Sequence, residues 1–108
     1  MAIPKVFRET ALTVIGSTPA RFITKAVNAS YNLTVASIGT NVVVRSEFSL
    51  DNGTTWTNCN TADTTITTIG QFIIPILTAN TIVPMVRLTL VTITGGTPTV
   101  TPTLRFNQ

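Results

Sequence analysis

Side chains that could do acid–base, nucleophilic or metal chemistry are few in this sequence. It has no histidine and one cysteine, and its carboxylates are Glu9, Glu47, Asp51 and Asp63. Without histidine, Ser–His–Asp and Cys–His catalysis and every His-ligated metal site are excluded. A single thiol cannot form an internal disulfide, and Cys59 stands in a polar stretch without a basic neighbour. These residues predict a protein that is not an enzyme and uses no cofactor or metal.

One pair of carboxylates lies close in sequence, as the two acids of a glycosidase must lie close in space. Glu47 and Asp51 are four positions apart, but Asp51 begins the turn Asp51-Asn52-Gly53, and Glu47 shares one face of a strand with Arg45. Short polar residues and glycine are typical of tight hairpin turns. We therefore expect a hydrogen-bonded turn aspartate and a solvated glutamate.

The charge pattern argues against nucleic acid and membrane partners. The net charge is +3, but the seven basic residues form no run and alternate with no aromatic cluster that could stack bases. Residues 64–86 carry no charge, yet they include Pro75 and Pro84 and many β-branched residues, which favours strands over a membrane span. The first eight residues lack the continuous apolar core of a secretion signal, which counts against a pilus or adhesin subunit.

Alternation of apolar and polar residues with period two recurs along the chain, and no helical period is sustained. Tyr31, Leu33 and Val35 illustrate it, with polar residues between them. Threonine fills 23 of the 108 positions and charged residues 10%. With turn signals every eight to twelve residues, the pattern predicts an all-β chain: a single two-sheet β-sandwich of about eight antiparallel strands, jelly-roll or immunoglobulin-like.

The first nine residues are predicted to be organised differently from the rest of the chain. Residues 1–9 show no strand pattern, so we expect an amino-terminal arm there, and residues 10–108 make up the sandwich domain. Pro4, Lys5 and Arg8 are the candidate docking residues of this arm, which would reach a neighbouring protein.

One strand is predicted to be apolar on both faces. Phe72, Ile74 and Ile76 alternate with Ile73, Pro75 and Leu77, and proline cannot donate to a sheet ladder, which places this strand at an edge or a bulge. A bare apolar edge strand would aggregate, so we expect a partner to cover it. The candidate interface residues are Phe72, Ile73, Ile74, Ile76, Leu77 and Met85.

The segment Ser49-Leu50-Asp51-Asn52-Gly53-Thr54-Thr55-Trp56 has the pattern S-x-D-x-G-x-T-W. It resembles the Asp-box hairpin of sialidases and other β-propellers. The resemblance implies a structural turn: the aspartate accepts backbone hydrogen bonds, the glycine supplies an unusual dihedral angle, and the tryptophan packs across the hairpin. The structural residues of this hairpin are Ser49, Asp51, Gly53, Thr55 and Trp56. A sialidase also needs several boxes, an arginine cluster and a tyrosine nucleophile, and this chain has one box and only Tyr31.

The same segment, together with Val86 to Leu90 and Gly95 to Thr101, also resembles small β-sandwich proteins of bacteriophage virions over roughly residues 40–106. This resemblance implies a capsid decoration, cement or fibre-associated role in the virion, which assembles in the host cytoplasm. We expect a homo-oligomer that binds a capsid or other virion protein through apolar interfaces. The alternative is a carbohydrate-binding module that would grip sugars with Trp56 and Tyr31.

Overall fold

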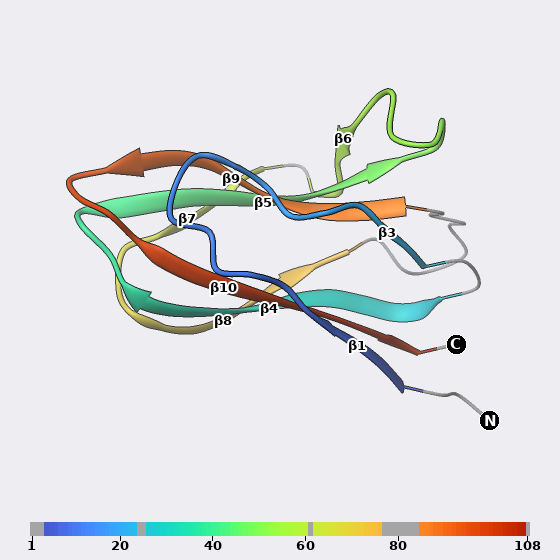
Figure 1. Ribbon diagram of the computed structural model, residues 1–108, viewed down its shortest axis with the longest axis horizontal. Helices are drawn as coiled ribbons and strands as arrows, with labels where there is room; N and C mark the ends of the chain where they lie inside the picture. The colour runs from blue at the N-terminus through green and yellow to red at the C-terminus, as the bar shows by residue number, and fades with distance from the viewer. Residues whose placement is uncertain (1–3, 24–25, 61, 77–84, 108) are drawn as a thin grey trace.

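The computed structural model describes residues 4–23, 26–60, 62–76 and 85–107. These residues form ten strands and no helix. The strands are β1 (Pro4–Arg8), β2 (Gly16–Ser17), β3 (Arg21–Phe22), β4 (Val27–Ser37), β5 (Asn41–Ser49), β6 (Thr57–Asn58), β7 (Thr64–Ile66), β8 (Gly70–Pro75), β9 (Met85–Thr94) and β10 (Thr99–Asn107). They stack as two antiparallel sheets, one of four strands and one of six, which confirms the predicted β-sandwich (Figure 1).

The strand order identifies the sandwich as a jelly roll. One sheet has the order β1-β10-β4-β8 and the other β2-β9-β5-β6. Both β2 and β3 pair with β9, and both β6 and β7 pair with β5, so each of these short pairs occupies one strand position. The resulting eight positions pair first with last, second with seventh, third with sixth and fourth with fifth. A long hairpin wrapped into two layers gives this order, which distinguishes a jelly roll from an immunoglobulin fold.

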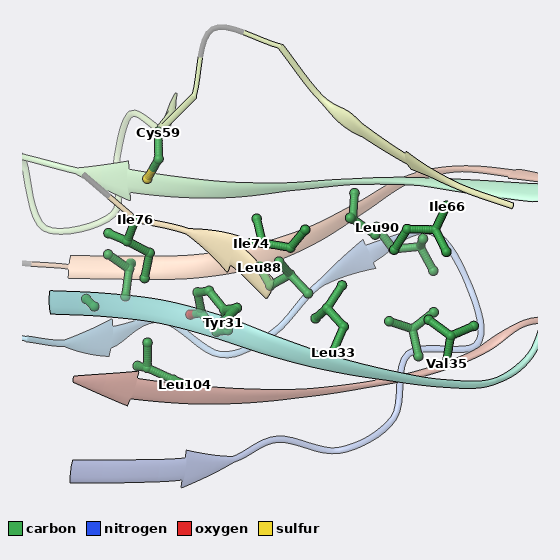
Figure 2. Packing of buried hydrophobic residues seen from close by; sticks show 14 of the residues in the cluster. Tyr31, Leu33, Val35, Cys59, Ile66, Ile74, Ile76, Leu88, Leu90 and Leu104 are labelled. Carbon is green, nitrogen blue, oxygen red and sulfur yellow. The ribbon is translucent and has the colours of Figure 1, made fainter. Parts of the chain in front are cut away.

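The core lies between the two sheets and is built by the alternation seen in the sequence. Tyr31, Leu33 and Val35 of β4 point inward and are at most 2% exposed. Leu88 and Leu90 of β9 reach the same space from the other sheet (Figure 2). Because successive side chains of a strand point to opposite faces, one face of each central strand is apolar and the other faces outward.

The amino-terminal segment differs from its prediction. Pro4–Arg8 forms β1, which pairs along its length with β10, from Pro4 opposite Asn107 to Arg8 opposite Thr103. Glu9 is buried, and its amide donates to the Pro102 carbonyl (3.0 Å). The expectation of an arm separate from the sandwich is therefore wrong for residues 4–9, and residues 1–3 lie outside the described part. The pairing partner lies about a hundred positions away, so no local pattern could indicate it.

Candidate interaction surfaces

The Asp-box hairpin joins β5 to β6, and hydrogen bonds bring its predicted residues together. Ser49 Oγ donates to Asp51 Oδ1 (2.8 Å) and accepts from the amide of Gly53 (2.8 Å). The Thr55 amide donates to Asp51 Oδ1 (2.8 Å), and Trp56 Nε1 donates to the Gly53 carbonyl (3.1 Å). These hydrogen bonds close the turn on itself, and the hairpin rises from the end of β5 away from the two layers (Figure 1).

The backbone of this turn passes through the left-handed region at two successive residues. Asn52 has φ 59° and Gly53 has φ 89°. Asparagine and glycine tolerate this conformation better than other residues, which explains their place in the motif. A shallow depression of about 240 Å³ beside the turn is lined by Leu50, Asp51, Thr55 and Thr57.

Asp51 makes the stability of the hairpin depend on pH. The backbone hydrogen bond from Thr55, and then the hydroxyls of Ser49 and Thr55, hold the pKa of Asp51 below its ordinary value. A group whose pKa is lowered in the folded state contributes stability above its unfolded pKa and loses it as pH falls. We therefore expect the hairpin to weaken below about pH 4.

The measurement for this prediction is a carbon-13 NMR titration of the Asp51 carboxyl, with thermal melts of the wild type and of Asp51→Asn between pH 2 and pH 7. The acid-induced fall in melting temperature should be smaller in Asp51→Asn, because this variant has no proton to gain at residue 51. A carboxyl titration midpoint at or above about 3.9 would contradict the prediction.

A network of charged side chains, which the sequence did not reveal, covers the outer face of the six-stranded sheet. Glu47 of β5 accepts hydrogen bonds from Arg87 Nε (2.8 Å) and Thr89 Oγ1 (2.6 Å), both from β9. The Arg87 guanidinium carbon lies 4.1 Å from the centre of the Trp56 ring, a cation–π contact that ties the hairpin to the sheet. Glu47 is only 7% exposed, so the prediction of a solvated glutamate is wrong.

The same network continues across β5 toward β6 and β7. Arg45 Nη1 lies 3.7 Å from Glu47 Oε2, and Arg45 Nη2 donates to Asp63 Oδ2 (2.9 Å). Asn58 Nδ2 donates to the other oxygen of Asp63 (2.7 Å). The only signal in the sequence was the Arg45 and Glu47 pair on one face. Arg87 becomes its neighbour through the register that sets Glu47 opposite Arg87.

The predicted apolar interface is brought together only in part. β8 is indeed an edge strand, since it is the last strand in the order of the four-stranded sheet. Ile73 is 68% exposed and Phe72 is half-buried against the core. Ile74, Ile76 and Met85 are buried, so their assignment to an exposed interface is wrong. Ile74 and Ile76 belong to the core between the sheets, whereas the Met85 sulfur lies under the Asp-box hairpin, 3.5 Å from the position of a β-carbon at Gly53. Leu77 lies outside the described residues.

The predicted docking residues Pro4, Lys5 and Arg8 are exposed, but on the edge strand β1 rather than on an arm. Glu9, which directly follows this strand, forms a bidentate ion pair with Arg21, with nitrogen–oxygen distances of 2.9 and 2.6 Å. These hydrogen bonds raise the pKa of Arg21. The ion pair ties the start of β3 to the end of β1.

The exposed apolar side chains have a common location. Seven large hydrophobic residues are exposed among those described: Val6, Val14, Ile15, Phe22, Leu50, Ile69 and Ile73. Each of them lies on an edge strand or in a connection, and none lies on the central strands β4, β5, β9 and β10. Apolar surface is therefore concentrated along the rims of the sandwich, where another molecule can cover it.

Comparison with known proteins gives no family for this chain. No protein-family model matches the sequence, and no curated protein matches it. Within the described ranges, no three His, Cys, Asp or Glu side chains gather as metal ligands would. The same ranges contain no helix with the length and apolarity needed to cross a membrane.

Proposed function

We propose that this chain is a non-enzymatic structural protein of a bacteriophage virion, which decorates or cements the capsid, or attaches to the tail, through oligomeric apolar interfaces. The observation that carries the proposal is the concentration of exposed hydrophobic side chains on the rims of the sandwich. The jelly-roll order is a supporting analogy, because this architecture recurs in viral capsid proteins. In this role the protein acts by burying surface against its neighbours.

The charge distribution is consistent with a surface that binds protein. Arg21, Arg45 and Arg87 are each ion-paired with a carboxylate of the same chain. Lys5 and Arg8 are exposed on β1, where they are available to an acidic neighbour. In this proposal Lys5 and Arg8 contact the neighbouring protein from the edge of the sheet rather than from a separate arm.

Carbohydrate binding through Trp56 and Tyr31 has less support. Tyr31 is 0% exposed in the core, so the prediction that it grips a sugar is wrong. Trp56 is half-buried, and Arg87 covers one face of its ring. A sugar-binding platform needs an open aromatic face, which this arrangement restricts.

The test of the virion role is mass spectrometry of particles purified on a density gradient from cells that carry the coding sequence. We expect peptides of this chain in the particle band, in constant ratio to the major shell protein. Peptides found only in the soluble fraction would overturn the proposal. In parallel, a glycan array probed with the wild type and with Trp56→Ala tests the alternative, since sugar binding lost in Trp56→Ala would favour a carbohydrate module.

A further inference from the structure

β8 leaves backbone hydrogen-bonding groups without a strand to pair with. Among the described residues, only β4 pairs with β8. The Ile76 amide donates to the Ala29 carbonyl (3.2 Å), so this pair is a hydrogen-bonded pair of the ladder. Bonded and non-bonded pairs alternate along an antiparallel ladder, so every second residue counted back from Ile76 also faces β4. The backbone groups of Gln71 and Ile73 therefore point toward the open edge.

The carbonyl of Pro75 supports this alternation independently. Pro75 belongs to the outward set, and its carbonyl accepts from Ser46 Oγ of β5 (2.8 Å) and from Asn60 Nδ2 in the connection after β6 (3.1 Å), not from β4. Pro75 itself has no amide hydrogen. The open part of the edge thus consists of two amides and two carbonyls, at Gln71 and Ile73.

We propose that β8 pairs with β8 of a second copy of this chain, antiparallel and centred on Phe72, so that two four-stranded sheets become one sheet of eight strands. The inference rests on the proposed function, because it names the first neighbour that an exposed rim would engage. The pairing is isologous: the same strand contributes the same groups from both copies.

The edge of β8 is complementary to itself in this register. Centring on Phe72 sets Gln71 opposite Ile73 of the second copy and Ile73 opposite its Gln71. All four outward groups of each copy are then paired, which no register centred on Ile73 achieves, because it would place Gln71 opposite Pro75. The exposed Ile69 also comes opposite Pro75, and the two Phe72 rings become a direct cross-strand pair.

Charge favours β8 over the other edge of the same sheet for self-pairing. Residues 64–86, which include β8, contain no charged residue, so two copies of β8 can meet without charge repulsion. The opposite edge strand, β1, carries Lys5 and Arg8 and begins with Pro4. Lysine and proline are the residues that protect edge strands against pairing, and in a self-pair of β1 the cations of both copies would gather.

The first experiment measures oligomeric state by sedimentation of the purified chain from about 1 µM to about 200 µM, since a strand-edge contact buries less than a large permanent interface. We expect wild type to approach twice its mass of 11.5 kDa. Ile73→Lys should raise the dissociation constant by about tenfold or more, because it places two like charges across the axis. The control is Ile15→Lys, at a residue with similar exposure (62% against 68%) on the opposite rim, which should dimerise like wild type.

Each outcome decides the inference. A wild-type chain that stays monomeric, or a dimer that survives Ile73→Lys, would overturn β8 pairing. A dimer broken by Ile15→Lys instead would show that the other rim is the interface. Matched circular dichroism and melting temperatures of the two variants exclude misfolding as the cause. Because only the isolated chain is used, a monomeric result leaves the particle analysis to decide the virion role, and absence from particles leaves the dimer result standing.

The register has its own test by disulfide formation. In a ladder centred on Phe72, the two copies of residue 72 form a non-hydrogen-bonded pair with α-carbons about 4.5 Å apart, within disulfide reach. Phe72→Cys should therefore give covalent dimers under mild oxidation, whereas Ile73→Cys should give few. The wild type, whose Cys59 is buried, is the control. More cross-linking in Ile73→Cys than in Phe72→Cys would overturn the proposed register. Concentration-dependent protection of the Gln71 and Ile73 amides from hydrogen exchange should accompany dimerisation.

Discussion

Gly39→Ala should destabilise the fold by about 3 kcal/mol or more, because a methyl group at this position has no space. The β-carbon would overlap the carbonyl group of Gly95 and lie 2.6 Å from the amide nitrogen of Gly96. Gly39 belongs to the connection between β4 and β5, and the two other glycines belong to the connection between β9 and β10. Both connections meet backbone to backbone at one end of the sandwich, where the Thr40 amide donates to the Thr94 carbonyl (2.8 Å).

The contact cannot relax by a side-chain rotation, since the atoms in the way are backbone atoms. Gly95 (φ 79°) and Gly96 (φ 145°) hold conformations that other residues rarely adopt, so their connection has little freedom to withdraw. We expect Gly39→Ala to lower the midpoint of urea unfolding, which is monitored by Trp56 fluorescence.

The matched control is Gly16→Ala, the same substitution in β2. Nothing lies within 4 Å of a β-carbon built at Gly16. Adding a methyl group there should change stability by less than about 1 kcal/mol, with slight stabilisation because the unfolded chain loses freedom. Equal unfolding midpoints for the two variants would show that the end of the sandwich tolerates a separation of its two connections.

Glu47→Ala should cost about 2–3 kcal/mol, because it leaves Arg87 Nε and the Thr89 hydroxyl without their carboxylate acceptor and removes one of the two carboxylates beside Arg45. Glu47 is the centre of the network: it accepts from Arg87 and Thr89 and lies beside Arg45. The side chains of Arg45 and Arg87 are 30% and 27% exposed, so water partly compensates them, which keeps the effect below that of a fully buried pair.

Glu47→Ala should also change the surroundings of Trp56, which a general loss of stability would not do in the folded protein. Arg87 is held over the Trp56 ring while Glu47 anchors its Nε. Without the anchor we expect the tryptophan emission to shift to longer wavelength under native conditions. The control is Asp63→Ala, which removes the carboxylate that binds Arg45 at the other end of the network and should cost no more than about 1 kcal/mol. An unchanged emission spectrum in Glu47→Ala would refute the anchoring role.

Local periodicity was sufficient to predict the all-β sandwich. The inward row of Tyr31, Leu33 and Val35 is buried as expected, because the side-chain direction of a strand depends only on its own alternation. The Asp-box turn was equally visible, since its hydrogen bonds join residues at most four positions apart.

The expectations from sequence failed where a side chain's surroundings come from segments far away in the chain. Glu47 was placed on the correct face of its strand, but its burial depends on Arg87, forty positions later, and on the hairpin that lies beside them. Ile74 and Ile76 were assigned to an interface, because apolar residues on both faces of a segment do not reveal which face is covered within the chain.

The sequence by itself determined the class of fold, the turn at Ser49 to Trp56 and the small number of side chains suited to catalysis. All three follow from composition and from neighbours a few residues apart. Only the tertiary structure decided the jelly-roll order, the place of β1 beside β10 and the open edge of β8. Strand order and register are set by pairing between segments far apart in the chain, and the energy of that pairing comes from surfaces that exist only once both sheets are assembled.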